Sequence, residues 1–144
     1  MRLKSRDFKD NGNIPPEFTC DGRDVSPQLS WEDAPAETKS FALSVADPDA
    51  PGGTWIHWLV YDVSKDVRDI DQGSLPARAK QVENDFGKKD YGGPCPPYGT
   101  HRYIFTLYAL DDERLEDVNK RNFFDKVEKH ALDKAVLKGL YKRK

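Results

Sequence analysis

Two long runs of the sequence are apolar or aromatic at successive positions, and they constrain the fold more than any other feature. Residues 55–63 read WIHWLVYDV and residues 103–110 read YIFTLYAL. Successive side chains of a strand point to opposite faces, so both faces of each run must be covered. We therefore predict two central strands inside a layered β protein.

Shorter strands are predicted around these two. Residues 41–46 alternate large and small side chains with a period of two, which is typical of a half-buried strand. Further short candidates are residues 18–20, 29–31 and 79–82, separated by turns rich in Pro, Gly and Asp. No alternation of strand and helix occurs. The pattern predicts a mainly β fold, an antiparallel β-sandwich of two sheets, as a single domain over residues 1–144.

The end of the chain changes to a helical period. Asn122 can cap a helix, and Gly139 is expected to end it. The apolar stripe of this helix comprises Phe124, Val127, Ala131 and Ala135, widened by Val136 and Leu140. We predict a C-terminal helix that covers the sandwich with this stripe and turns its lysines to solvent.

Charge and hydropathy limit the partners. The chain has 23 basic and 25 acidic side chains, a net charge of -2, which leaves no basic footprint for nucleic acid. Residues 112–144 are locally basic, and we interpret their lysines as the solvent-exposed face of the predicted helix. No apolar run reaches the roughly 18 residues of a spanning helix, and no signal peptide is expected. These features predict a cytoplasmic protein without integral membrane contact.

The two cysteines, Cys20 and Cys95, lie far apart in the sequence. In a chain without an export signal, two reduced thiols are expected rather than a disulfide.

Three segments carry residues suited to chemistry. Residues 47–53 (DPDAPGG) contain two carboxylates and two prolines in the first five positions, and the prolines stiffen the backbone, although a simple polar turn has the same composition. His57 lies inside the most apolar strand, where a core histidine with satisfied nitrogens is an equally good interpretation. Residues 91–100 (YGGPCPPYGT) form a stiff loop that ends at His101, and Tyr103 shares a face with that histidine. At least one X-Pro bond of these two turns is expected to be cis.

Asp47, His57 and His101 all lie near predicted strand ends, so they could meet at one rim of the sandwich. Two imidazoles that donate hydrogen bonds beside rigid turns suit a small anion such as phosphate. A nearby carboxylate would fix the imidazole tautomers and keep the rings partly protonated.

Two other chemistries could use the same residues. Cys95 with either histidine could form a thiol nucleophile and its base, but the Gly-Pro-Cys-Pro-Pro context provides no helix N-terminus to stabilise a thiolate. Asp47, Asp49, His57 and His101 are possible zinc ligands, but their spacing matches no common zinc motif. We therefore expect no enzymatic activity, no metal and no cofactor.

Taken together, these motifs resemble the phosphatidylethanolamine-binding protein family, most closely its bacterial and archaeal branch of Raf kinase inhibitor-like proteins. The segments that carry the resemblance are DPDAP at 47–51, WIH at 55–57, GPCPPYGTHRY at 93–103, FTCDG at 18–22, SPQLSW at 26–31 and GLY at 139–141. They cover nearly the whole chain in the expected order.

The resemblance implies a β-sandwich with a small anion-binding pocket at one end. The pocket residues that it implies are Asp47, His57, His101 and Tyr103, with Pro51, Trp55, Cys95, Pro96 and Pro97 as walls. It also implies binding of phosphate or phosphorylated head groups without catalysis. The alternative is inhibition of a protease or kinase through protein–protein contacts. The partners it allows are thus a small anion or phosphorylated small molecule, a protease or kinase, and a second copy of the chain.

Overall fold

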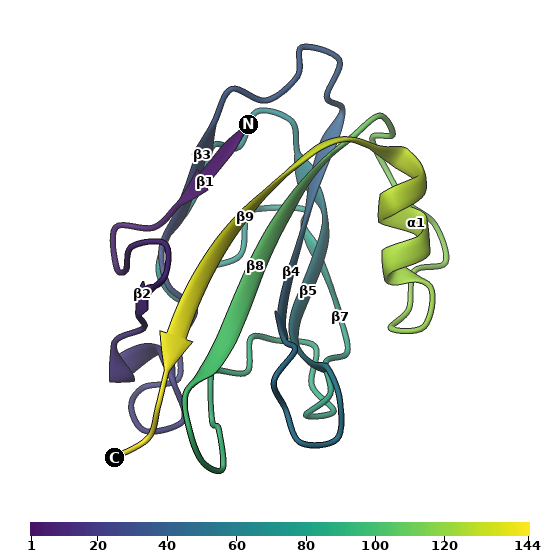
Figure 1. The fold of residues 1–144 in the computed structure, drawn as a ribbon. Helices are drawn as coiled ribbons and strands as arrows, with labels where there is room; N and C mark the ends of the chain where they lie inside the picture. Colours follow the sequence, from purple (N-terminus) through teal and green to yellow (C-terminus); the bar gives the residue numbers. More distant parts are fainter.

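The computed structural model describes all 144 residues, and its strands form two sheets (Figure 1). The larger sheet has the order β2-β9-β8-β4-β5-β7, and the smaller sheet has the order β1-β3-β6. The strands of the larger sheet are β2 (Gly12–Asn13), β9 (Ala131–Tyr141), β8 (His101–Leu110), β4 (Ser40–Asp47), β5 (Trp55–Ser64) and β7 (Lys80–Val82). Those of the smaller sheet are β1 (Arg2–Lys4), β3 (Leu29–Glu32) and β6 (Asp69–Ile70). The helices are a short 3-10 helix, η1 (Pro16–Phe18), and one α-helix, α1 (Phe123–His130).

Neighbouring strands are antiparallel except β2 and β9, which are parallel. The predicted antiparallel sandwich of two sheets is therefore confirmed. Strands were predicted correctly at residues 29–31 and 79–82, where β3 and β7 lie. The strand predicted at residues 18–20 is wrong, because that segment begins with the last residue of η1 and contains no strand.

The central strands are covered on both faces, as their apolar runs predict. On one face, Phe41 of β4 and Phe105 of β8 belong to a core shared with Trp31 of the smaller sheet. On the other face, Leu59 of β5 belongs to a second apolar cluster with Phe123 of α1. The larger sheet thus lies between a smaller sheet and a helix, and α1 stands at its far side in Figure 1.

A β-bulge interrupts the pairing of β4 with β5. Val45 lies opposite Trp58, whereas the next residue, Ala46, lies opposite Ile56, so His57 is an extra residue on β5. A bulge of this kind bends the strand locally and changes the direction of a side chain. Strand periodicity alone does not predict that the bulge lies at His57, a candidate site residue.

The predicted helix from Asn122 to Gly139 is wrong in its second half. Helix α1 ends at His130, and the chain continues directly as β9, which pairs with β8 along its length. Asn122 is the N-cap residue of α1 as predicted, but its side chain makes no capping hydrogen bond to the helix. The helix does cover the sandwich, and it is not long and apolar enough to cross a membrane.

Cys20 and Cys95 form a disulfide, with their Cα atoms 5.4 Å apart. The expectation of two reduced thiols is therefore wrong, and the cysteines give no support to a reducing compartment. The expected cis X-Pro bond is also wrong, because every peptide bond is trans.

Candidate functional site

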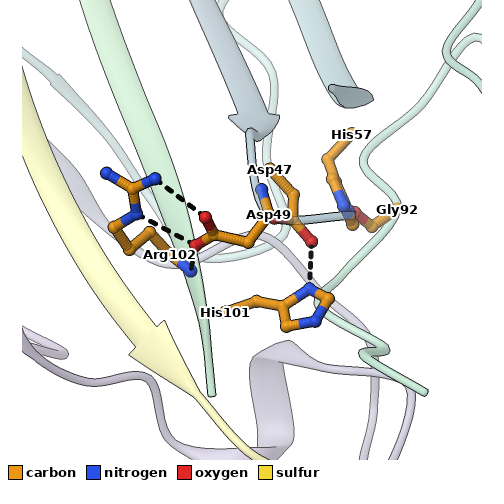
Figure 2. Close-up of polar contacts among 6 residues, drawn as sticks. All are labelled: Asp47, Asp49, His57, Gly92, His101 and Arg102. Carbon is orange, nitrogen blue, oxygen red and sulfur yellow. Dashed lines mark hydrogen bonds and ion pairs between the residues drawn. The ribbon is translucent and has the colours of Figure 1, made fainter. Parts of the chain in front are cut away.

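The candidate site lies where β4 ends and where β5 and β8 begin. Asp47 is the last residue of β4, His57 is the third residue of β5, and His101 is the first residue of β8. Because β8, β4 and β5 are antiparallel neighbours, these three strand ends lie side by side at one end of the sheet, which we call the site edge. Figure 2 shows both histidines gathered near the Asp47 carboxylate, so the structure brings the three predicted residues together.

His101 is held by Asp47 (Figure 2). Its Nδ1 donates a hydrogen bond of 2.7 Å to Oδ2 of Asp47, and both side chains are more than nine-tenths buried. The other carboxylate oxygen accepts the backbone N–H of Asp49 at 2.8 Å. With the Nδ1 hydrogen directed to the carboxylate, Nε2 is the free nitrogen of the ring, and it makes no hydrogen bond with the protein.

His57 is held by the backbone of Gly92. Its Nδ1 donates to the Gly92 carbonyl at 2.6 Å, while the Gly92 N–H donates to the His57 carbonyl at 3.0 Å. The bulge turns the ring toward Tyr103, which it meets edge-on at 5.3 Å, whereas strict alternation would place it on the face of Leu59. The Nε2 atom of this ring is also free of protein partners.

Burial determines the charge of His57. Desolvation is the largest effect and lowers the pKa of this imidazole below its ordinary value. The Gly92 carbonyl and the Asp47 carboxylate oppose it only in part. The ring is therefore neutral at pH 7, with Nε2 as an acceptor, and an anion placed beside it would favour its protonation.

Tyr103 adds a buried hydroxyl without a partner. The residue is 0% exposed, and its hydroxyl oxygen makes no hydrogen bond. Its ring lies against both imidazoles, edge-on to His57 and stacked on His101 at 6.5 Å. Burial and the nearby Asp47 carboxylate raise the pKa of Tyr103, so the hydroxyl keeps its proton. A buried polar group without a hydrogen-bond partner lowers the free energy of unfolding by about 1–3 kcal/mol. Packing of the core does not explain why this hydroxyl is kept.

An ion pair lies beside these groups and was not predicted (Figure 2). Arg102 donates from Nε and Nη2 to the two oxygens of Asp49 at 2.9 and 2.8 Å, and its backbone N–H donates to Oδ2 at 2.9 Å. These hydrogen bonds lower the pKa of Asp49 to about 2. They tie the turn after β4 to the first residues of β8, which fixes Asp47 relative to His101. The signals in the sequence were Asp49 in the proline-rich turn and an arginine next to a candidate histidine.

The predicted wall residues differ in exposure. Trp55 is exposed at the start of β5, and Pro51 and Pro97 are exposed in their turns. Pro96 is buried, and Cys95 is half-buried in the disulfide, so it offers no free thiol to a nucleophilic mechanism. No three His, Cys, Asp or Glu side chains in the chain are arranged to hold a metal ion.

The loop beside His57 depends on a residue that the sequence analysis did not single out. The side chain of Asn84 is fully buried, and its amide N–H donates to the His57 carbonyl at 3.1 Å. Its carbonyl oxygen accepts the backbone N–H groups of Phe86 and Lys88. The loop therefore presents Phe86 to the edge of the His57 ring at a centroid distance of 5.2 Å. A turn-forming sequence around one aromatic residue, NDFG at 84–87, was the available signal.

Comparison with known proteins identifies the family. The family model described as phosphatidylethanolamine-binding protein matches residues 4–142. The chain belongs to this family. This family member is 44% identical over 150 residues to a UPF0098 protein of Methanothermobacter thermautotrophicus, with 99% of both chains covered. It is 43% identical over 129 residues to the UPF0098 protein YbhB of Escherichia coli, covering 81% of this chain and 82% of the relative.

Two solved structures share the fold of this family member. The crystal structure of Escherichia coli YbcL, described as a new member of the mammalian PEBP family, matches with a TM-score of 0.94 at 30% identity. It covers 99% of this chain and 98% of that chain. The putative PEBP homologue CT736 of Chlamydia trachomatis matches with a TM-score of 0.92 at 38% identity, covering 99% and 97% of the two chains. The family resemblance seen in the sequence motifs is thereby confirmed.

Proposed function

We propose that this protein binds a small phosphoryl anion, phosphate or a phosphomonoester, at His57 and His101 without transforming it. One observation carries the proposal: two buried imidazoles are each anchored through Nδ1, so that each keeps a free Nε2 at the site edge. The partnerless hydroxyl of Tyr103 against both rings supports it. Phosphate oxygens accept hydrogen bonds from groups of these types.

The pH dependence of binding follows from the state of His57. Burial keeps this ring neutral in the free protein, so Nε2 becomes a donor only when the ring takes up a proton. Proton uptake adds a positive charge and a hydrogen-bond donor that face the anion. Affinity for phosphate is therefore expected to rise as the pH falls through the histidine range.

Titration with inorganic phosphate, followed through the histidine ring resonances by NMR, tests the proposal. We expect His57 and His101 to shift. His130 is an internal control, because it pairs with Asp111, just past the opposite end of β8, at 2.8 Å. If the chemical shifts of His57 and His101 did not change at tens of millimolar phosphate, the proposal would be ruled out.

Two matched variants make the test residue-specific. The His101→Gln variant keeps an N–H group for Asp47 but loses the free Nε2, and we expect it to weaken phosphate binding at least about tenfold. His130→Gln removes the other histidine–aspartate pair and should bind phosphate as the unmodified protein does. The alternative, inhibition of a protease or kinase through protein contacts, requires no intact His57 and predicts inhibition that His57→Gln leaves unchanged.

A further inference from the structure

Two large aromatic side chains are exposed beside His57. Trp55 is 39% exposed and Phe86 is 41% exposed. Their rings meet edge to face at 5.6 Å, and Phe86 also meets the His57 ring edge-on at 5.2 Å. Neither residue belongs to the apolar core on either face of the larger sheet. Paired apolar rings exposed next to a polar site are typical of a surface that contacts a ligand.

The surrounding backbone holds Phe86 in this place. The buried Asn84 accepts the Phe86 N–H at 2.9 Å. Gly92 leaves space for the ring, since a Cβ at that position would collide with two carbon atoms of Phe86. The carbonyl of the same glycine anchors His57. One backbone unit, Gly92, therefore positions both the imidazole and the aromatic ring.

We propose that Trp55 and Phe86 contact the organic group of the ligand, and that the site takes an aromatic phosphomonoester in preference to inorganic phosphate or a small alkyl ester. This inference rests on the proposed function, because the phosphoryl group must lie at His57 and His101. An aromatic ester group gains stacked or edge-to-face contact with two rings and removes apolar surface from water. Inorganic phosphate would leave both rings in solvent.

Calorimetric titration with phenyl phosphate, methyl phosphate and inorganic phosphate tests this preference. We expect the unmodified protein to bind phenyl phosphate about threefold to tenfold more tightly than methyl phosphate. Phe86→Leu and Trp55→Leu should each bring that ratio toward one, because each weakens the binding of phenyl phosphate more than the binding of methyl phosphate. Leu132→Ala is the matched control, because Leu132 is 40% exposed but lies at the beginning of β9, which pairs with the far end of β8. It should keep the full ratio.

Two results would overturn the inference. One is equal affinity of the unmodified protein for phenyl phosphate and methyl phosphate. The other is a preference for phenyl phosphate that survives in both the Phe86→Leu and the Trp55→Leu variants. Failure of the proposed function has a different signature, since none of the three compounds would then bind and the His57 and His101 resonances would stay still. In that case both proposals fall.

Discussion

The two site histidines differ in the group that holds them. His101 donates its Nδ1 hydrogen to a carboxylate, whereas His57 donates to a backbone carbonyl. Burial lowers the pKa of the His57 imidazole, whose residue is 3% exposed, and the Gly92 carbonyl opposes this only in part. The charge of the His57 ring therefore depends on whether an anion lies beside it.

A pH dependence of stability follows at this residue. Burial lowers the pKa of His57 in the folded protein, so the unfolded chain takes up the proton at a higher pH than the folded protein does. The free energy of unfolding should therefore fall as the pH drops below about 6.5, by at most about 1.4 kcal/mol per pH unit from this residue. His57→Gln, which keeps an N–H group for the Gly92 carbonyl, should remove that part of the slope.

Denaturant unfolding between about pH 7.5 and pH 5.5 measures the difference. Parallel pH profiles for the unmodified protein and the variant would show that His57 has an ordinary pKa. Added phosphate should flatten the slope of the unmodified protein alone, because an anion at the site favours the protonated ring.

For individual residues, the sequence predicted which polar side chains meet but not how each one is oriented. Strand periodicity placed Asp47, His57 and His101 near strand ends, and the sheet order brings those ends together. The bulge at His57 depends on the register between two strands, which neither strand specifies by itself. The ion pair of Asp49 with Arg102 joins two segments whose proximity appears only in the folded chain.

At the scale of elements, the C-terminal segment fits both periods. Val127, Ala131 and Ala135 are spaced as on a helix face, while Ala135 and Leu137 alternate as in a strand. Only the first half is helical, because pairing with β8 satisfies the backbone of β9 and buries its alternate side chains. Local pattern could not decide this, since the partner strand is distant in the sequence.

The face of α1 that covers the sheet can be tested with two adjacent residues. Phe123 is 0% exposed and belongs to the second apolar cluster, between α1 and the larger sheet, whereas Phe124 is only half-buried. We expect Phe123→Ala to lower the free energy of unfolding by about 3–5 kcal/mol. Phe124→Ala should cost clearly less. Urea denaturation compares them, and a larger loss in Phe124→Ala would mean that the helix packs through its other side.

For the molecule as a whole, the disulfide joins the loop beside the site to the segment after η1. In the same loop, the Gly93 N–H donates to the Asp24 carboxylate of this segment, and the Tyr91 hydroxyl donates to the carbonyl of Phe18, the last residue of η1. The pairing was not predictable, because sequence spacing carries no information on the distance between two Cα atoms. The expectation of reduced thiols rested on an argument about the cellular compartment, and the disulfide contradicts that expectation.

Reduction of the bridge should destabilise the whole fold. The cysteines are 75 residues apart, and a cross-link of that span stabilises a protein by up to roughly 4 kcal/mol through the unfolded chain. Thermal or urea unfolding with and without a dithiol reductant measures the loss. The Cys20→Ser/Cys95→Ser double variant should already unfold at the lower midpoint and respond to no reductant. Equal midpoints for the oxidised and reduced protein would show that the bridge contributes nothing to stability.

The same bridge divides the chain mechanically. Residues 20–95 form a closed ring that contains β3, β4, β5, β6 and β7, while β1, β2 and η1 on one side and β8, α1 and β9 on the other lie outside it. If the molecule is pulled by its two ends, the covalent path of the force crosses the sulfur bridge, so the backbone of the ring cannot be extended even after the strands outside it have detached. At about 3.4 Å per extended residue, the fully stretched chain is about 250 Å shorter with the disulfide than without it, because the ring does not extend. The strand ends carrying Asp47 and His57 lie within that protected length, while His101 is carried by a tail that force can remove.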